Sequence, residues 1–289
     1  MLQKSTITLL RIPFSFFLMP VFFFALSQVP HINFLKASLV FVILHFILYP
    51  ASNGYNSYMD RDEGSIGMIE KPPEATRQLF VLTAVLDCMA IMLAFLVNYL
   101  FVVCIVANIL ASRAYSYRGI RLKRFPVVGF LTVVVFQGAI TFLMVYAGAY
   151  AGELHQPPWA GMLISSLLFG GFYPLTQVYQ HKQDLDDGVI TISYKLGTNG
   201  TFIFSGIMYA MAEVVLFMYL SGNDQQLQFW ILQVFFLPVV IYFLYWWKKV
   251  LADRRNANYQ YSLRMNIVAA SCTNTAFTLI FLLNHRAFE

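Results

Sequence analysis

Two stretches of this chain carry the same kinds of polar side chain in the same order. Residues 49–66 read YPASNGYNSYMDRDEGSI, and residues 173–190 read YPLTQVYQHKQDLDDGVI. Aligned end to end, the two stretches agree at once in tyrosine, amide, carboxylate and glycine positions. Chance rarely produces such agreement, so the sequence contains one polar motif twice.

Within each copy, an amide precedes a carboxylate by four residues. The first copy has Asn56 and Asp60, and the second has Gln180 and Asp184. Residues four apart lie on one face of a helix, so each copy should present its amide and its carboxylate together. Mg2+ prefers a few carboxylates, retained waters and substrate phosphates. The spacing therefore predicts a Mg2+ site between the two faces, with Asp60 and Asp184 as its principal ligands.

Further acids follow each pair, and each run ends in glycine. The runs are Asp62, Glu63 and Gly64 in the first copy, and Asp186, Asp187 and Gly188 in the second. We expect Asp62 and Asp186 to assist the metal, together with the amides Asn56 and Gln180. The glycines should let the backbone leave the helix in a conformation that other residues reach only at a cost.

Basic residues occur on the same predicted face of the membrane as the two motifs, in the motif segments and in the loops beside or opposite them. We expect five of them to bind a diphosphate group, with Arg11 as a further candidate; the five are Lys71, Arg77, Arg118, Lys123 and Lys182. A metal between acidic motifs, ringed by cations under a lining of Phe, Leu and Met, suits a lipid diphosphate. Such charges would neutralise a leaving diphosphate. The alternative is that these cations only set the membrane topology.

The elements that must position these residues are membrane helices. The chain is 59% hydrophobic and 11% charged, whereas soluble proteins are about 25% charged. Nine apolar runs approach the ~20 residues that cross a bilayer. They cover about residues 7–28, 34–53, 79–97, 99–115, 127–151, 159–179, 201–221, 227–247 and 265–284. We therefore predict an all-α integral membrane protein with nine transmembrane helices.

The distribution of positive charge supports nine spans. With the N-terminus in the cytoplasm, all 19 Lys and Arg residues except Lys36 and Arg286 fall in inward-facing segments, as positive-inside topology requires. Both motif copies then lie on the cytoplasmic face. The net charge of +5 follows this asymmetry, so we expect a lipid bilayer as partner and no nucleic acid. We expect the plasma (inner) membrane as the location and no cleaved signal peptide.

The spacing of the copies predicts how the two halves are related. Four helices separate them, and an even number of crossings returns the chain to the same face. The internal repeat should therefore be parallel, with both motifs at one cavity mouth. We expect a single membrane domain over residues 1–289, with halves of approximately 1–125 and 126–245, followed by helices to the C-terminus.

Polar residues inside apolar runs are candidates of another kind. His45 and Asp87 could serve as a base or an orienting group at an acceptor site, and Glu213 is a second intramembrane acid. Such acids are functional candidates by default. The alternative is a hydrogen-bonded acid within the bundle. The three cysteines lie in apolar runs without metal-ligand spacing, so we expect them to be core residues.

The complete pattern resembles the UbiA superfamily of intramembrane prenyltransferases, the 4-hydroxybenzoate polyprenyltransferase-like enzymes. The resemblance covers nearly the whole chain and includes nine helices and polar motifs after the second and sixth. It also includes the Lys71-Pro72 turn, Tyr115-Ser116 and RLKRFP between helices four and five. It implies that Mg2+ and the motifs bind a prenyl diphosphate, with Asp60 and Asp184 catalytic. It further implies transfer of the prenyl group to an aromatic or other hydrophobic acceptor, in isoprenoid or quinone biosynthesis.

The motifs depart from the family pattern at three carboxylate positions. The family's first motif is usually Asn-Asp-x-x-Asp-x-x-x-Asp and its second Asp-x-x-x-Asp; here these positions hold Asn56, Ser57, Asp60 and Gly64, then Gln180 and Asp184. Either Asp62 and Asp186 take over, or metal affinity is lower, or the chemistry is lost. Asp62 can help only if the helix ends after Asp60, because two residues turn a helix by about 200°. The alternative functions are a membrane carrier or a non-catalytic lipid-binding or scaffold relative.

Overall fold

The computed structural model describes residues 2–61, 63–152 and 156–285. Within these ranges the chain consists of helices and their connections, which confirms the predicted all-α class. With α for α-helices and η for 3-10 or π segments, the elements are α1 (Lys4–Leu9), η1 (Ile12–Phe17), α2 (Met19–Ser27), α3 (Phe34–Val42), η2 (Ile43–Leu48), α4 (Tyr49–Asp60), α5 (Arg77–Ala94), α6 (Tyr99–Ser116), η3 (Leu122–Arg124), α7 (Pro126–Val134), η4 (Val135–Ile140), α8 (Thr141–Ala149), α9 (Trp159–Phe172), η5 (Tyr173–Thr176), α10 (His181–Asp186), α11 (Ile192–Gly222), α12 (Gln226–Ala252), η6 (Arg254–Asn256) and α13 (Tyr259–Asn284).

These elements form long apolar spans. In the described part of the chain, eight helices are long and apolar enough to cross a membrane, and a bent pair, Lys4–Phe17 with Met19–Ser27, makes a ninth span if counted as one. Three of the eight spans join consecutive elements: Phe34–Asp60 contains α3, η2 and α4, Pro126–Ala149 contains α7, η4 and α8, and Trp159–Thr176 contains α9 and η5. The chain is therefore an integral membrane protein, as predicted.

Breaks within the spans have local causes. The first span bends by 42° between η1 and α2, and Pro13 and Pro20 lie at the starts of those two elements. Proline is tolerated in a first helical turn because its missing N–H is unpaired there anyway. Arg11, just before η1, has a left-handed φ of 47°. The second and fifth spans each contain a π-helical segment, η2 and η4, a feature frequent at functional sites.

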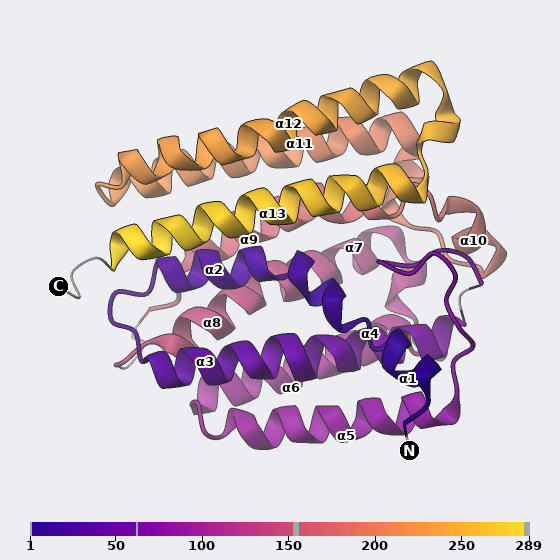
Figure 1. Ribbon diagram of the computed structural model, residues 1–289, viewed down its shortest axis with the longest axis horizontal. Coiled ribbons are helices and arrows are strands. Elements are labelled where there is room, and N and C mark those ends of the chain that lie inside the picture. Colours follow the sequence, from indigo (N-terminus) through magenta and orange to yellow (C-terminus); the bar gives the residue numbers. More distant parts are fainter. Residues whose placement is uncertain (1, 62, 153–155, 286–289) are drawn as a thin grey trace.

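Both motif copies reach the same end of the bundle (Figure 1). This end, called the motif end below, holds the last turn of α4 and the short helix α10, and the N-terminus lies on the same side. The C-terminal end of α13 lies at the opposite end (Figure 1). Helix α13 packs against α2 and α12, and α11 packs against α9. The large core, from Leu18 to Ile280, fills the space between the spans.

The two motif copies have different backbones. In the first, α4 stays helical to Asp60 and then ends, because Arg61 has a left-handed φ of 52°. In the second, α9 gives way to η5, a turn and α10. The backbone N–H of Asp184 nevertheless donates to the carbonyl of Gln180 at 2.9 Å, so the predicted four-residue relation persists in a single helical turn.

The glycines at the ends of the two motifs have different roles. Gly188 has a positive φ of 70°, as predicted for a residue that lets the chain leave a helix. Gly64 is not among the positive-φ residues of the described chain, and Arg61 takes the left-handed conformation in its copy. The expectation for Gly64 was wrong because α4 ends at Asp60, four residues before it.

Candidate active site

A polar cavity of about 260 Å3 lies between the spans at the motif end. Its walls come from η1, α4, α6, α7 with η4, the segment from η5 to α10, and α13. The two amides and two carboxylates predicted from the repeat all line it, namely Asn56, Asp60, Gln180 and Asp184. The structure therefore brings both motif copies to one cavity.

The first motif is held in place by hydrogen bonds across three elements. Asn56 Nδ2 donates to Asp60 Oδ2 at 2.7 Å and to Ser116 Oγ at 3.0 Å. The guanidinium of Arg11 donates to the carbonyl of Asn53 at 3.2 Å and to Asn56 Oδ1 at 3.5 Å. The left-handed turn at Arg11 thus directs a cation to the amide of the motif, and Asn56 orients the carboxylate beside it.

Lys123 provides a positive charge next to Asp60. Its Nζ lies 2.6 Å from Asp60 Oδ1, without the alignment of a hydrogen bond. The two side chains are only 11% and 4% exposed. Removing charges from water is costly unless the partners are close, so the pairing allows Asp60 to remain a buried carboxylate at the cavity wall.

The loop between α6 and α7 also binds the second motif. Arg121 donates to the carboxylate of Asp187 and, at 2.9 Å, to its backbone carbonyl. Arg118 Nη1 lies 3.3 Å from Asp187 Oδ1, and its Nε donates to the carbonyl of Met59 at 2.8 Å. Arg121 also lies 3.9 Å from Asp60. This loop therefore ties the two motifs together.

Sequence reasoning missed the roles of Arg121 and Asp187. Both were visible as charges next to the predicted ligands, but no periodic spacing connects a loop arginine with an acid 66 residues away. The DxDDG run of the second motif was the available signal, because it offers two further acids after Asp184. Neither Asp186 nor Asp187 lines the cavity, and the structure uses Asp187 for the ion pairs.

The two motif copies also touch directly. Gln180 Nε2 donates to the carbonyl of Ser65 at 3.3 Å. A Cβ atom on Gly64 would lie 2.5 Å from Oε1 of Gln183. That oxygen is at the end of a flexible side chain, so the contact places the first motif close to α10 without requiring glycine at position 64.

Two tyrosines lie between the motifs. The hydroxyls of Tyr115 on α6 and Tyr173 on η5 are hydrogen-bonded to each other, and both residues line the polar cavity. Asp60 and Asp184 both act electrostatically on each of these tyrosines. The two carboxylates therefore lie near the same pair of rings, and such rings can stabilise a nearby cation by roughly 0.5–2 kcal/mol each.

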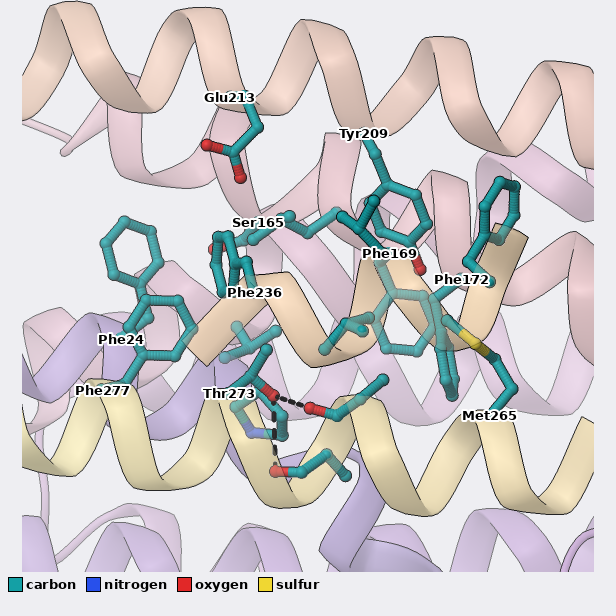
Figure 2. A pocket seen from close by; sticks show the side chains of 18 of the residues that line it. Phe24, Ser165, Phe169, Phe172, Tyr209, Glu213, Phe236, Met265, Thr273 and Phe277 are labelled. Carbon is teal, nitrogen blue, oxygen red and sulfur yellow. Dashed lines mark hydrogen bonds between the residues drawn. The ribbon is translucent and has the colours of Figure 1, made fainter. Parts of the chain in front are cut away.

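A second, apolar cavity of about 360 Å3 lies beside the polar one, between α2, α9, α11, α12 and α13. Figure 2 shows Tyr209 and Glu213 on one side of it and Phe24 and Phe277 on another. Glu213 accepts a hydrogen bond from Gln233 at 2.8 Å. The cavities adjoin: Phe14 lines the polar one and Phe17 the apolar one, and their rings are 5.4 Å apart.

Several predicted diphosphate and metal residues lie outside the polar cavity. Lys71, Arg77, Lys182 and Asp186 are exposed and do not line it. Asp62 lies outside the described residues, although α4 does end after Asp60, as its participation requires. Of the predicted cations, Arg11 and Lys123 line the cavity, whereas Arg118 does not but donates to the backbone carbonyl of the lining residue Asp60 at 3.4 Å.

The two residues predicted for an acceptor site, His45 and Asp87, contact neighbouring side chains of the helix bundle and not the polar cavity. His45 is fully buried in η2, with ring centroids of Phe41 and Tyr49 at 4.6 and 5.2 Å. Asp87 on α5 is ion-paired with Arg113 on α6, whose guanidinium lies 3.9 Å from the ring centroid of Tyr55. Neither His45 nor Asp87 lines the polar cavity.

His181, on α10, is a histidine within the second motif. Its Nε2 lies 2.8 Å from Ser193 Oγ at the start of α11. Burial lowers the pKa of His181 below its ordinary value of 6.5, because a low-dielectric environment disfavours the charged form. The neutral imidazole therefore links α10 to α11.

The sequence over most of this chain fits one known family. The profile of the UbiA prenyltransferase family matches residues 16–268. The chain belongs to this family. Members of the UbiA family are prenyltransferases, so the protein is an enzyme of this class that works within the membrane. The resemblance drawn from the two motifs is confirmed. No functionally curated protein matches the chain in sequence.

Solved UbiA structures share the fold along nearly the whole chain. A UbiA homologue from Archaeoglobus fulgidus bound to GPP and Mg2+ is 17% identical, with 96% of this chain and 99% of that chain covered and a TM-score of 0.71. A digeranylgeranylglyceryl phosphate synthase is 18% identical over 97% and 98%, with a TM-score of 0.64. The apo UbiA homologue from Aeropyrum pernix K1 is 16% identical over 91% and 97%, with a TM-score of 0.63.

The polar cavity has a donor set that suits a Mg2+ ion shared with a phosphate ligand. Among the described residues, no three His, Cys, Asp or Glu side chains come together as a metal site. Two carboxylates, Asp60 and Asp184, and two amides, Asn56 and Gln180, do line one cavity. Mg2+ is commonly bound by one or two carboxylates, waters and substrate phosphates. The residues therefore fit a metal shared with a diphosphate, and not an all-protein cage.

Proposed function

We propose that this protein transfers a prenyl group from a prenyl diphosphate to a hydrophobic acceptor, with Mg2+ as cofactor. The observation that carries the proposal is the convergence of Asp60 and Asp184 with Lys123 and Arg11 on one cavity. A buried site with both acids and cations suits a diphosphate with its metal. An uncharged ligand would have no use for those charges.

The residues have separate roles in this proposal. Asp60 and Asp184 would hold Mg2+, assisted by Asn56 and Gln180, and the bound metal would neutralise charge on the leaving diphosphate. Lys123 and Arg11 would bind diphosphate oxygens. Charge-assisted hydrogen bonds of this kind are about twice as strong as neutral ones.

The apolar surroundings would accommodate the rest of the donor. The adjoining cavity, rich in phenylalanine (Figure 2), offers an apolar space for a prenyl chain. Tyr115 and Tyr173 would face the carbon from which diphosphate departs and stabilise its positive charge. The buried location would keep water from that carbon.

One observation favours a second candidate, a relative that binds a lipid diphosphate without transferring it. Asp60 and Asp187 are already paired with Lys123 and Arg121. A cation that stays paired with protein is a weaker ligand for diphosphate, and three acids of the usual family motifs are absent. The proposed location, with the motif end in the cytoplasm, applies to both candidates and follows the inward bias of Lys and Arg.

The deciding experiment is a transfer assay on the purified full chain in nanodiscs. Labelled geranyl, farnesyl and geranylgeranyl diphosphates are incubated with a panel of acceptors, with Mg2+ or with EDTA. The proposal predicts Mg2+-dependent release of diphosphate that Asp184→Asn abolishes. Asp253→Asn, an exposed acid in the α12–α13 loop, is the matched control and should behave as wild type. Tight donor binding without release would establish the second candidate.

A further inference from the structure

Deeper in the polar cavity, four neutral amides form a layer of their own. They come from four spans and all line the cavity: Asn53 on α4, Asn108 on α6, Gln137 on η4 and Asn266 on α13. Each amide can be placed by counting along its span from the residue at the motif end. Asn53 lies seven positions into its span, Asn108 eight, Gln137 eleven and Asn266 seven. At 1.5 Å per helical residue, this places the amide layer roughly 10–16 Å from that end.

Each amide in the layer has an unsatisfied atom. Within the described part of the chain, no hydrogen-bond partner exists for Nδ2 of Asn53 and Asn108, Oε1 of Gln137 or Oδ1 of Asn266, all of which are buried. Asn108 and Asn266 are only 1% and 6% exposed. An unpaired buried polar atom costs about 1–3 kcal/mol, and folded proteins contain few of them. Oε1 of Gln177, which follows η5 at the motif end of the same cavity, is a fifth such amide atom. Together these amide atoms indicate that a ligand supplies their partners.

Among the described residues that line the cavity, the cations are Arg11 and Lys123. Lys123 pairs with Asp60, and Arg11 donates to Oδ1 of Asn56 and to the backbone carbonyl of Asn53, a residue of the amide layer. The lining acids, Asp60 and Asp184, belong to the motifs themselves. The proposed function assigns both cations to the diphosphate, so no further cation among the described lining residues balances a carboxylate on an acceptor, and burying an unpaired carboxylate is expensive.

The hydrogen-bonding capacity of amides limits the ligand further. An amide offers donors on its nitrogen and acceptors on its oxygen. A carboxylate only accepts hydrogen bonds, so it would leave the amide oxygens unpaired. A hydroxyl group both donates and accepts, so it can pair with either atom. Phe136, which also lines the cavity, can pack against the apolar part of such a ligand.

We propose that the amide layer is the acceptor subsite and that it selects an uncharged acceptor with at least two hydroxyl groups. This inference rests on the proposed function, because it names the substrate class of the same cavity. In the transfer step, the acceptor forms a bond to the prenyl carbon and loses one proton. The diphosphate leaves with the electron pair of the broken carbon–oxygen bond and takes up that proton.

The first test compares two probes of similar size that differ in charge, 2-methylhydroquinone and 2,5-dihydroxybenzoate. Their dissociation constants are measured on the full chain in nanodiscs, with and without the unreactive donor analogue geranyl S-thiolodiphosphate. The neutral diol should bind at least about tenfold more tightly than the carboxylate, the effect of one buried unmatched group. Equal or tighter binding of the carboxylate, or no binding of either probe, would overturn the proposal.

Near-isosteric variants then test the named residues. Asn108→Leu and Gln137→Met should each weaken diol binding by about tenfold, the effect of one hydrogen bond near the upper end of its usual range, and should leave binding of the donor analogue unchanged. Gln228→Met is the matched control, because Gln228 is hydrogen-bonded to Asn284 at the opposite end of the bundle. Unchanged diol binding in both cavity variants would refute the assignment.

A gain-of-function variant separates this inference from the proposed function. Gln137→Arg would add a cation to the amide layer and should shift the binding preference from 2-methylhydroquinone toward 2,5-dihydroxybenzoate. An unchanged ratio of the two dissociation constants would count against the amide layer as the acceptor subsite. Selective diol binding without diphosphate release from any donor would refute the proposed function alone. Normal release with a preference for the carboxylate would refute the amide layer alone.

Discussion

Asp60 has one contact that follows from the local sequence and one that depends on the tertiary fold. It accepts a hydrogen bond from Asn56 on its own helix, and it lies against Lys123 from a distant loop. The first contact follows from the four-residue spacing and was predictable. The second depends on how the α6–α7 loop folds back over the motif end, and no local pattern specifies that path.

Lys123 should matter more for donor binding than the other predicted lysines. Replacing it in Lys123→Gln removes a buried charge next to Asp60, so affinity for a prenyl diphosphate analogue should fall by about 10–100-fold, as expected for a charge-assisted bond of ~1.5–3 kcal/mol. The measurement is a titration with geranyl S-thiolodiphosphate. Lys182→Gln is the comparison, because Lys182 is exposed and outside the cavity. An equal loss in both variants would contradict this ranking.

His181 should make stability depend on pH. Its pKa in the folded protein is below the ordinary value of 6.5, so the unfolded chain takes up the proton first as pH falls. The stabilisation is complete above about pH 6.5 and is lost as the pH falls toward the lower folded pKa. Melting temperatures between pH 8 and pH 5 should fall more steeply for wild type than for His181→Gln. Parallel pH profiles would exclude this role.

The α6–α7 loop is the element that joins the motifs. Its Arg121 bonds Asp187 of the second motif and lies near Asp60 of the first. Arg121 is mostly buried and Asp187 is about one third exposed, so part of the pairing is screened by solvent. The loop should therefore set the distance between the motifs as well as contribute charge.

A double-mutant cycle on Arg121→Gln and Asp187→Asn measures that connection. The two changes should be non-additive in unfolding free energy by about 1 kcal/mol, as for contacting residues in a charged network. Both single variants should also weaken donor binding. Arg255 and Asp253 form an exposed pair that serves as the control and should show no resolvable coupling. Full additivity of the Arg121 and Asp187 changes would show that the α6–α7 loop is not coupled to the second motif.

The end of the second motif depends on one glycine. Gly188 has a φ of 70°, and nothing lies within 4 Å of a Cβ placed there, so Gly188→Ala tests backbone strain without a clash. It should destabilise the protein by roughly 1–2 kcal/mol. Gly206→Ala is the control: it also meets open space but lies inside α11 and should stabilise by about 0.5–1 kcal/mol. Equal melting temperatures for the two variants would contradict the conformational argument.

For the whole molecule, the sequence was sufficient for the number of spans, the convergence of the two motifs and the family. Apolar run length and the distribution of Lys and Arg are properties of single segments, so they do not depend on how the segments pack together. The positions of Lys71, Arg77 and Lys182 were less predictable, because closeness to a motif in the sequence does not fix the direction of a long side chain. The amide layer was also missed, since Asn53, Asn108, Gln137 and Asn266 share no spacing and meet only through helix packing.

The central claim is that the two motifs form one metal-dependent diphosphate site. The most direct measurement is the affinity of the purified full chain for geranyl S-thiolodiphosphate, with Mg2+ and with EDTA. We predict at least about tenfold weaker binding in EDTA, the effect of losing one or more charge-assisted contacts. The double variant Asp60→Asn and Asp184→Asn should show the same weak binding with or without Mg2+, while Asp253→Asn should match wild type. Wild-type affinity that is unchanged by EDTA and equal to that of the double variant would contradict the account.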